Sequence, residues 1–384
     1  GRVDYKADNY QAIINQTAEG QVLYTINSST VRNNQLTSQS IKDFQAAIDA
    51  IKANERQTIV STDVIAYASP DGKEDQNAKL SDNRSKSAEK AFGKVTKKHE
   101  YDAPVNVKSV GEDWEGFQEL VAASDLEDKD LIIRVLSMYS DPAVREKEIK
   151  NMSAVYTTLA KEVLPELRRA RFIANVEFTN YTSEELLDLI ENNIDVLDEE
   201  ALLRAATLVK ENDDKLAIYR KAVDKFNSAR AQYNLAVTYI NMDDLAKAKN
   251  ALGKVEADSD VYNALGVIAL REDDLNAAAE YFSLSGNATS VENAAIIDIL
   301  DGEYKAAAQK LAGKNSFNAG LAQVLTGNNN PAFDHNCPKS SYLRAVAAAR
   351  RGDAATVKSE LANAAKKEAL AERAAKDVEF AQFR

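Results

Sequence analysis

Four short runs in the first half of the chain place apolar and polar residues at alternate positions or are rich in β-branched residues. Such runs predict β-strands; they lie at residues 21–27, 58–67, 105–110 and 171–178. Apolar residues recur at helical spacing between these runs, and residues 113–168 follow that spacing almost throughout. The order predicts an α/β sandwich with one sheet and a long helical insert before the last strand.

The boundaries of this region follow from the same pattern. Residues 1–19 are mostly polar and predict a linker or a short lead-in helix. Residues 20–180 form the predicted sheet domain, with its helical insert at about 113–168. Asp141 followed by Pro142 is a good helix start inside the insert, since Asp caps a helix and Pro fits its first position.

From residue 182 to residue 384 the pattern is alanine-rich and helical, and it repeats. Small residues pair at a spacing of twelve: Ala236 with Ala248, Gly266 with Ala278, Ala295 with Ala307, Gly320 with Ala332, and Ala345 with Val357. A turn residue follows the first member of each pair by seven positions: Asp243, Asp273, Gly302, Gly327 and Gly352. Two helices that meet at small residues form an antiparallel hairpin, and stacked hairpins form a solenoid.

Two of these units resemble tetratricopeptide repeats. The residues that carry the resemblance are 234–239 with Ala248 and Leu252, and 262–266 with Ala278 and Phe282. The steps between turn residues are 30, 29, 25 and 25, shorter than the family period of about 34, so we expect shortened hairpins toward the C-terminus. The overall fold class is therefore α+β, an α/β sandwich followed by an all-α tetratricopeptide-like solenoid.

The resemblance implies a concave face that binds a protein partner. The residues that we expect to line it are Tyr233, Asn234, Tyr239, Tyr262 and Asn263. The alternative for each tyrosine is that it packs between hairpins.

Composition narrows the function without identifying it. The 384-residue chain has a formal net charge of −12, which argues against a general nucleic-acid or anionic-membrane binder. No run of about 18 apolar residues occurs, so we expect no transmembrane segment. There is one cysteine, Cys337, and with His335 it falls short of a four-ligand zinc site. We find no phosphate loop or nucleophile motif and therefore expect no cofactor, no metal and no enzymatic activity.

One corner of the sheet domain carries candidate binding chemistry. The turn at 69–72 follows the second strand, and Asn77 and Arg84 share a face at the start of the next helix. Asn77, Leu80, Ser81 and Arg84 resemble the N-x-x-L-S-x-x-R helix start of OmpA-like peptidoglycan-binding domains. A strand, a turn and a helix start with a guanidinium make a plausible anion site.

The OmpA-like resemblance implies that Arg84 holds the carboxylate of a diaminopimelate in the peptidoglycan stem peptide. In that family an Asp holds the ammonium group, but here Ser69 occupies its position. Ser69 supplies no charge, and the lost charge-assisted hydrogen bond costs about 1.5–3 kcal/mol. Asp71 lies in the same loop and is a candidate to replace it.

These observations give two functional hypotheses. In the first, the chain is a non-enzymatic protein of a Gram-negative cell envelope, tethered to peptidoglycan while its repeats bind an unidentified envelope protein. In the alternative, the OmpA-like pocket has lost its ligand and the whole chain is an assembly scaffold. Either hypothesis places the protein in the periplasm or at the outer membrane, and we expect a leader and an anchor to precede residue 1.

Overall fold

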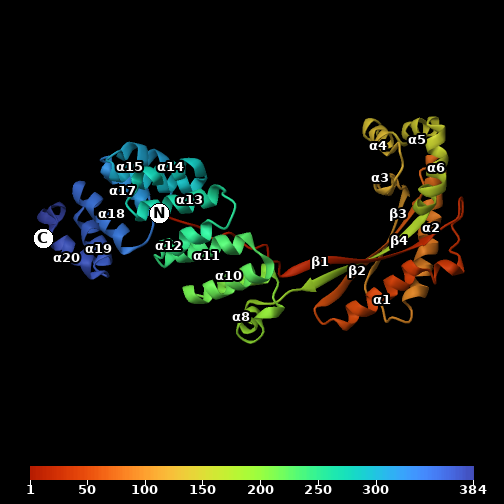
Figure 1. The fold of residues 1–384 in the computed structure, drawn as a ribbon, viewed down its shortest axis with the longest axis horizontal. Coiled ribbons are helices and arrows are strands. Elements are labelled where there is room, and N and C mark those ends of the chain that lie inside the picture. The colour runs from red at the N-terminus through yellow and green to blue at the C-terminus, as the bar shows by residue number, and fades with distance from the viewer. The chain divides into compact units, whose positions relative to one another are not determined.

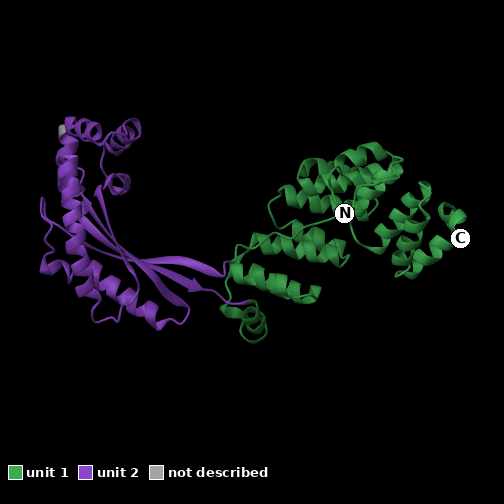
Figure 2. Cartoon of the chain, turned by 180° about the vertical axis from the view of Figure 1, so that it is seen from behind, with its two compact units in different colours: residues 1–10, 183–384 green, residues 11–182 purple. Residues whose placement is uncertain are grey.

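The protein forms two compact units. The structure, a computed structural model, describes residues 1–152 and 154–384. Residues 11–182 form one unit, and residues 1–10 together with residues 183–384 form the other (Figure 2). The segment 1–10 therefore belongs with the helical repeats and not with the sheet that follows it in the chain.

The sheet unit contains four strands in the order β1-β4-β2-β3 (Figure 1). Strand β4 is antiparallel to both β1 and β2, whereas β2 and β3 run parallel. The strands are β1 (Ile13–Leu23), β2 (Gln57–Ala68), β3 (Val105–Glu112) and β4 (Arg169–Thr179). This mixed sheet with helices confirms the fold predicted for the first half of the chain.

Helices α1 (Gln39–Ala53) and α2 (Glu74–Thr96) cover one face of the sheet. Strand β4 buries alternate residues against them, as its period of two requires. Phe172 of this strand packs against Phe44 of α1 and Phe92 of α2, with ring centroids 6.2 and 5.3 Å away. Burial of these apolar side chains fixes the register of the sheet.

Strand β1 begins at Ile13, eight residues before the start expected from its sequence. The expectation failed because the buried positions before residue 21 carry small residues, Ala18 and Gly20, and not large apolar ones. A side chain at Gly20 would have its Cβ 2.7 Å from Cβ of Phe44. Close packing of helix α1 thus requires glycine at this position, and glycine interrupts the alternation of apolar and polar residues that predicts a strand.

The insert between β3 and β4 is helical, as predicted, and has its own apolar core. Asp141 caps its third helix by accepting a hydrogen bond from the Val144 amide at 3.0 Å, and Pro142 takes the first helical position. The helices of the insert are α3 (Trp114–Ala123), α4 (Lys129–Met138), α5 (Pro142–Asn151), α6 (Ser153–Glu162) and α7 (Leu164–Leu167).

The second unit is an array of helical hairpins, which confirms the predicted solenoid. It opens with α8 (Ser183–Asn192). Paired helices follow: α9 (Glu199–Leu208) with α10 (Asn212–Phe226), α11 (Ala229–Asn241) with α12 (Leu245–Leu252), α13 (Ser259–Arg271) with α14 (Leu275–Ser285), and α15 (Ala288–Leu300) with α16 (Tyr304–Lys310). Helix α17 (Phe317–Leu325) precedes the last pair, α18 (Pro338–Arg350) with α19 (Ala354–Ala364), and then α20 (Glu368–Lys376).

All five predicted turn residues adopt the left-handed backbone conformation that a tight helix-to-helix turn requires. Their φ angles are 61° at Asp243, 59° at Asp273, 82° at Gly302, 91° at Gly327 and 78° at Gly352. Glycine and aspartate tolerate this region better than other residues, so the turns were readable from sequence.

One predicted hairpin is incomplete. Gly320 was expected to meet Ala332 on a second helix, but residues 326–337 contain no helix. Phe333 fills the space instead, because a Cβ at Gly320 would lie 2.4 Å from its ring. Pro331 and the three asparagines before it do not sustain a helix.

Candidate functional site

Arg84, the expected ligand of a stem-peptide carboxylate, is fully buried. Its guanidinium donates three hydrogen bonds to backbone carbonyls: Nε to Ser28 at 2.9 Å, Nη1 to Tyr67 at 2.9 Å, and Nη2 to Thr25 at 3.2 Å. It also lies over the Tyr24 ring, 4.9 Å from the centroid. The expectation of an open guanidinium in this corner is therefore wrong.

The environment of Arg84 is that of a structural cation. Burial, helped by the nearby charge of Arg168, lowers the pKa of its guanidinium to about 10, although Tyr24 and Asp71 oppose the shift. The group still carries its charge at neutral pH. The carbonyls it binds belong to the segment after β1 and to the end of β2, so it ties that segment to the sheet.

The other residues of the corner bind one another. Asn77, 6% exposed, donates to the Ser69 carbonyl at 3.3 Å and to Oε1 of Glu112 at 2.8 Å. Ser69 donates its hydroxyl to Asp71, whose other carboxylate oxygen lies 3.4 Å from Nη2 of Arg168. Asp71 therefore pairs with Arg168 and is not presented as a free carboxylate.

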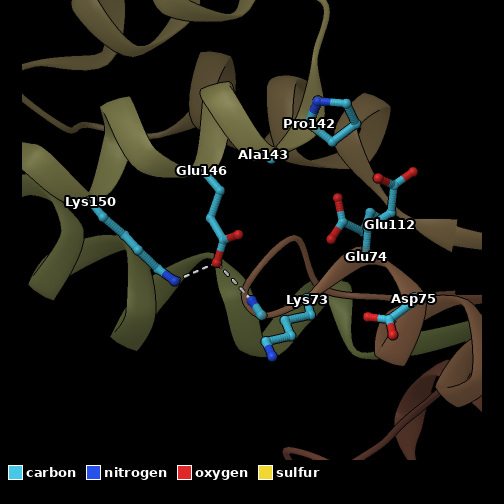
Figure 3. A pocket seen from close by; sticks show the side chains of 9 residues that line it. Lys73, Glu74, Asp75, Glu112, Pro142, Ala143, Glu146 and Lys150 are labelled. Atoms are coloured by element: carbon cyan, nitrogen blue, oxygen red, sulfur yellow. Dashed lines mark hydrogen bonds and ion pairs between the residues drawn. The ribbon is translucent and has the colours of Figure 1, made fainter.

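The helical insert also contributes to this corner. Glu146 of α5 accepts a hydrogen bond from the Gly72 amide at 2.8 Å and forms an ion pair with Lys150 (Figure 3). The Glu146 carboxylate thus already accepts the hydrogen bond from the turn amide that a bound anion would need. An open hollow of about 570 Å³ remains beside it, lined by Lys73, Glu74, Asp75, Glu112 and Glu146 among others. Lys150 lines the hollow as well, so four acidic and two basic side chains border it, and this acidic excess disfavours an anionic ligand.

A different site lies in the helical unit, where residues 2–9 occupy a groove along the first helices of successive hairpins. We call residues 2–9 the resident segment, and the surface of α9, α11, α13 and α15 that contacts it the groove. From Arg2 to Asn9 the resident segment passes α15 and α13, then α11, then α9, in reverse chain order. Residues 1–11 form no helix, so the lead-in helix expected here is absent.

Three asparagines hold the backbone of the resident segment. Asn234 of α11 accepts from the Lys6 amide at 2.7 Å and donates to the Lys6 carbonyl at 3.0 Å. Asn293 of α15 does the same at Arg2, accepting at 2.7 Å and donating at 2.8 Å. Asn263 of α13 donates to the Arg2 carbonyl at 3.1 Å and accepts from Asn293 at 2.9 Å. All three asparagines are at most 3% exposed.

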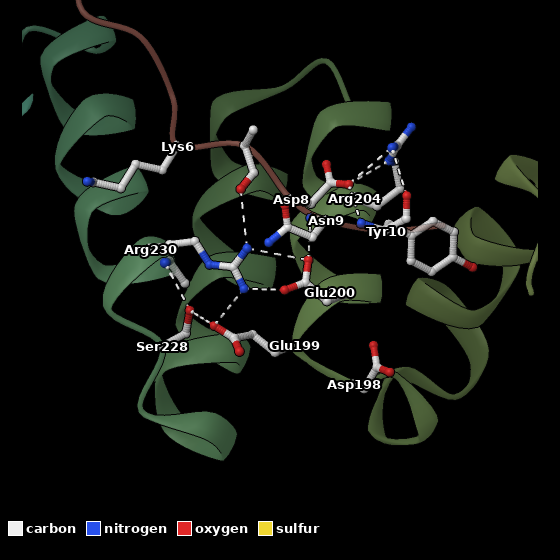
Figure 4. Close-up of polar contacts among 12 residues, drawn as sticks. Lys6, Asp8, Asn9, Tyr10, Asp198, Glu199, Glu200, Arg204, Ser228 and Arg230 are labelled. Atoms are coloured by element: carbon white, nitrogen blue, oxygen red, sulfur yellow. Dashed lines mark hydrogen bonds and ion pairs between the residues drawn. The ribbon is translucent and has the colours of Figure 1, made fainter. Parts of the chain in front are cut away.

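Further backbone contacts lie between and beyond these positions. The Tyr233 hydroxyl donates to the Asp4 carbonyl at 3.1 Å. Arg230 donates to the Ala7 carbonyl at 3.3 Å, and Glu200 accepts from the Asn9 amide at 2.5 Å (Figure 4). Arg230 and Glu200 also form an ion pair with each other. The groove therefore binds main-chain groups along the full length of the resident segment.

Side chains of the resident segment also have specific partners. Nζ of Lys6 lies 2.6 Å from Asp258 and 3.1 Å from Asp260, and 5.1 Å from the centroid of the Tyr233 ring. Burial opposes ionisation of Lys6, but the two carboxylates outweigh it and raise its pKa. The charge of Lys6 is thus matched by the groove.

Two more side chains are matched. Arg204 of α9 lies 3.1 Å from Oδ1 of Asp8. The Tyr5 ring stacks on Tyr219 of α10 at a centroid distance of 6.0 Å and an angle of 27°. Its hydroxyl lies 3.3 Å from Thr238 Oγ1 and accepts from Asn241 at 3.2 Å.

The structure brings some of the expected partner-binding residues to the groove and leaves others away from it. Asn234, Asn263 and Tyr233 contact the resident segment, whereas Tyr239 accepts from Arg220 at 2.7 Å and Tyr262 has no described contact with the segment. Sequence reasoning missed Asn293, although it follows Asn263 by 30 residues, as Asn263 follows Asn234 by 29. Other residues that contact the segment were missed and carry no repeat signal, among them Glu200, Arg204, Arg230, Asp258 and Asp260.

Cys337 and His335 lie beside the start of α18. Cys337 caps α18 by accepting from the Ser340 amide at 3.4 Å, and His335 lies 3.0 Å from the Ser340 hydroxyl. Among residues 1–152 and 154–384, no group of three or more His, Cys, Asp or Glu side chains could hold a metal ion. Within the same residues no helix has both the length and the apolar character needed to cross a membrane.

The chain matches no protein-family model, and no curated protein matches it. Several solved structures are similar to about half of it, and three of them illustrate the likeness. They are a tetratricopeptide repeat protein from Parabacteroides merdae (13% identity, 50% of this chain and 88% of that chain, TM-score 0.38), PilF of Pseudomonas aeruginosa (19%, 52% and 86%, TM-score 0.32), and YrrB, described as a TPR protein with an unusual peptide-binding site (19%, 51% and 100%, TM-score 0.28). At these TM-scores, the hairpins of this chain are the firmer basis for its helical-repeat fold.

Proposed function

We propose that this chain is a non-enzymatic scaffold whose groove holds an extended segment of a protein. The observation that carries the proposal is the pair of hydrogen bonds between the Asn234 side chain and the two main-chain groups of Lys6, at 2.7 and 3.0 Å. The same arrangement recurs at Asn293 and Arg2. A groove that repeats one clamp along its length is suited to binding chains.

The physical basis is that an asparagine amide both donates and accepts. It satisfies the amide and the carbonyl of one residue in an extended chain, which offer the same groups whatever the side chain. The asparagines of the groove are buried, and a buried polar group without a partner costs about 1–3 kcal/mol. A segment that covers these asparagines must therefore supply main-chain groups that hydrogen-bond to them.

We further propose that the sheet unit is part of an assembly scaffold and does not bind peptidoglycan. Its OmpA-like helix start supports a place in the envelope, in the periplasm or at the outer membrane. Three backbone carbonyls already engage Arg84, and Glu146 takes the turn amide, which favours the scaffold over peptidoglycan binding. The corresponding experiment is co-sedimentation of the full chain with purified peptidoglycan, in which we expect the protein to stay in the supernatant.

The test of the groove uses the full chain with its resident segment weakened. Proline at positions 2 and 6 removes the amides that Asn293 and Asn234 accept from, so Arg2→Pro/Lys6→Pro should free the groove. The probe is a fluorescent synthetic peptide with the sequence of residues 1–12. We expect its fluorescence anisotropy to rise with the double variant and to rise much less with the wild-type chain.

The matched control adds Asn234→Ala and Asn263→Ala to the double variant, which should abolish binding while circular dichroism shows retained helix. Failure of the peptide to bind the folded double variant contradicts the proposal. Equal binding with and without the two asparagines does so as well.

A further inference from the structure

The groove contacts side chains of the resident segment as well as its backbone, and the contacts fall at only some positions. We propose that the groove selects partner segments with an aromatic residue, a basic residue directly after it, and an acidic residue two positions further on. This is the pattern of Tyr5, Lys6 and Asp8, and the inference rests on the proposed function.

The basic position has the strongest chemical signature. Two carboxylates, Asp258 and Asp260, converge on Nζ of Lys6 at 2.6 and 3.1 Å, and the Tyr233 ring lies on the same cation. The Lys6 side chain is 24% exposed, so these charges are only partly screened by water. An acidic residue here would meet two like charges, and a neutral one would leave them unmatched.

The acidic position has opposite electrostatics. The Asp8 side chain is 8% exposed and lies 3.1 Å from Arg204. Glu200 lies close enough to Asp8 for their charges to interact unfavourably, but it is paired with Arg230. The net partner of this position is thus a cation, and a basic residue here would face Arg204.

The aromatic position is shaped by a ring and by two polar groups. Tyr219 offers a stacking surface that is almost completely buried. Thr238 and Asn241 lie within hydrogen-bond reach of the Tyr5 hydroxyl, and Nζ of Lys215 lies 5.8 Å from the centroid of the Tyr5 ring. Tyrosine satisfies all of these contacts, whereas phenylalanine would keep the stacking and the Lys215 contact but lose the hydrogen bonds of the hydroxyl.

The position between the basic and the acidic residue is not selected. Ala7 is exposed, and its carbonyl accepts a hydrogen bond from Arg230. Any residue that can be extended should fit there. This makes Ala7 an internal control for side-chain selectivity.

The resident segment acts as a tethered competitor at this site. A covalently linked ligand has an effective concentration on the order of millimolar, so a partner segment of equal sequence binds the wild-type chain weakly. A partner segment must therefore bind with higher affinity, or be present at a higher local concentration, than the resident segment. For this reason the test uses the Arg2→Pro/Lys6→Pro chain, called the released chain below.

The experiment uses the full-length Arg2→Pro/Lys6→Pro chain and fluorescent peptides of residues 1–12 with single changes. Relative to the unchanged peptide, we expect Lys6→Glu and Asp8→Lys each to weaken binding by about tenfold or more, and Ala7→Gln to leave it within about twofold. A charge reversal in the groove, Asp260→Lys, should weaken the unchanged peptide and improve the relative binding of the Lys6→Glu peptide. Asp260 is preferred to Asp258 because Asp258 also caps helix α13.

The outcomes separate this inference from the proposed function. If all peptides bind the released chain with equal affinity, side-chain selection is wrong while the backbone-binding groove stands. If the Asp260→Lys chain shows no change in preference between the two peptides, the basic position is not read by the groove. If no peptide binds at all, the proposed function itself fails.

Discussion

Asn234 and Lys6, which are 228 residues apart in the chain, are joined by two hydrogen bonds through one side-chain amide. Asn234, in the middle of α11, accepts a hydrogen bond from the Lys6 backbone amide and donates one to the Lys6 carbonyl. This contact places the beginning of the chain in the groove of its own helical repeats. It also shows how a helical repeat can hydrogen-bond a bound segment through a side chain that stays buried beneath that segment.

Asn234→Ala should loosen the resident segment without unfolding the repeats. The change removes both partners of Lys6, at a cost of about 1–3 kcal/mol. We expect faster hydrogen exchange at the Lys6 amide, measured by mass spectrometry, and unchanged exchange in α18. Asn250→Ala is the matched control, because Asn250 is exposed; equal protection of Lys6 in both variants would contradict the clamp.

The contribution of the Lys6–Asp258 pair should disappear in acid. Burial opposes ionisation of Asp258, but the hydrogen bonds from Lys6 and the Val261 amide outweigh it and hold its pKa below the ordinary value of 3.8. A lowered pKa adds stability that is complete above the ordinary value and is lost as pH falls through the folded-state pKa.

The measurement compares thermal unfolding of wild type and Lys6→Gln between pH 7 and pH 3. Asp258 is 48% exposed at its side chain, so screening limits the difference to about 0.5–1 kcal/mol at pH 7. That difference should shrink below about pH 4. A difference that stays constant to pH 3 would show that the ion pair does not stabilise the segment.

Arg84→Ala should destabilise the sheet unit strongly. It leaves a cavity and deprives three backbone carbonyls of their donor, for an expected loss of about 3–5 kcal/mol. Lys79→Ala on the exposed side of the same helix should change stability by less than about 0.5 kcal/mol. Chemical denaturation monitored at the sheet unit checks both, and a small effect of Arg84→Ala would mean that its burial is not structural.

Ser69→Asp, which restores the acidic residue of the OmpA-like pattern, should not create cell-wall binding. Ser69 is 5% exposed and donates to Asp71, so the new carboxylate would face an existing one. We expect a stability loss of about 1–3 kcal/mol and no sedimentation with peptidoglycan. Sedimentation of Ser69→Asp, with the wild type left in the supernatant, would show that the corner is a pocket that lost its charge.

Gly266→Ala should weaken the hairpin of α13 and α14. A Cβ at this position would lie 2.5 Å from the Phe282 ring, and overpacking of this kind costs about 1–3 kcal/mol. At Gly253 the nearest atom to a new Cβ is 3.5 Å away, so Gly253→Ala is the matched control. Thermal unfolding should separate the two, and equal melting temperatures would contradict the close packing.

The elements of the fold were mostly predictable because their signals are local. Alternation in 171–178 and helical spacing in 37–53 report which side chains face a core, and the turn residues report a backbone conformation. The failures are equally specific. The start of β1 was not predicted because close packing requires the small residue Gly20 there. The helix expected at Ala332 is replaced by a loop, and Phe333 of this loop packs against Gly320.

The candidate site was less predictable because its parts are distant in sequence. Asn234 and Asn263 were found from the repeat, and Asn293 was within reach of the same argument. The resident segment has no strong hydrophobic pattern of its own, so the sequence predicts only a linker or a short lead-in helix there. Asp258 and Arg204 gave no signal, since charged residues are common in this chain.

Local sequence signals were enough to predict most strands and helices, the hairpin turns, and two of the groove asparagines, Asn234 and Asn263, because each signal depends on neighbours or on the repeat spacing. The burial of Arg84 as a structural cation and the position of residues 2–9 in the groove become visible in the folded chain alone. Both outcomes depend on backbone groups, Thr25 and Ser28 for the arginine and Arg2 and Lys6 for the asparagines. Every residue type carries such groups, so only folding reveals which of them a side chain will meet.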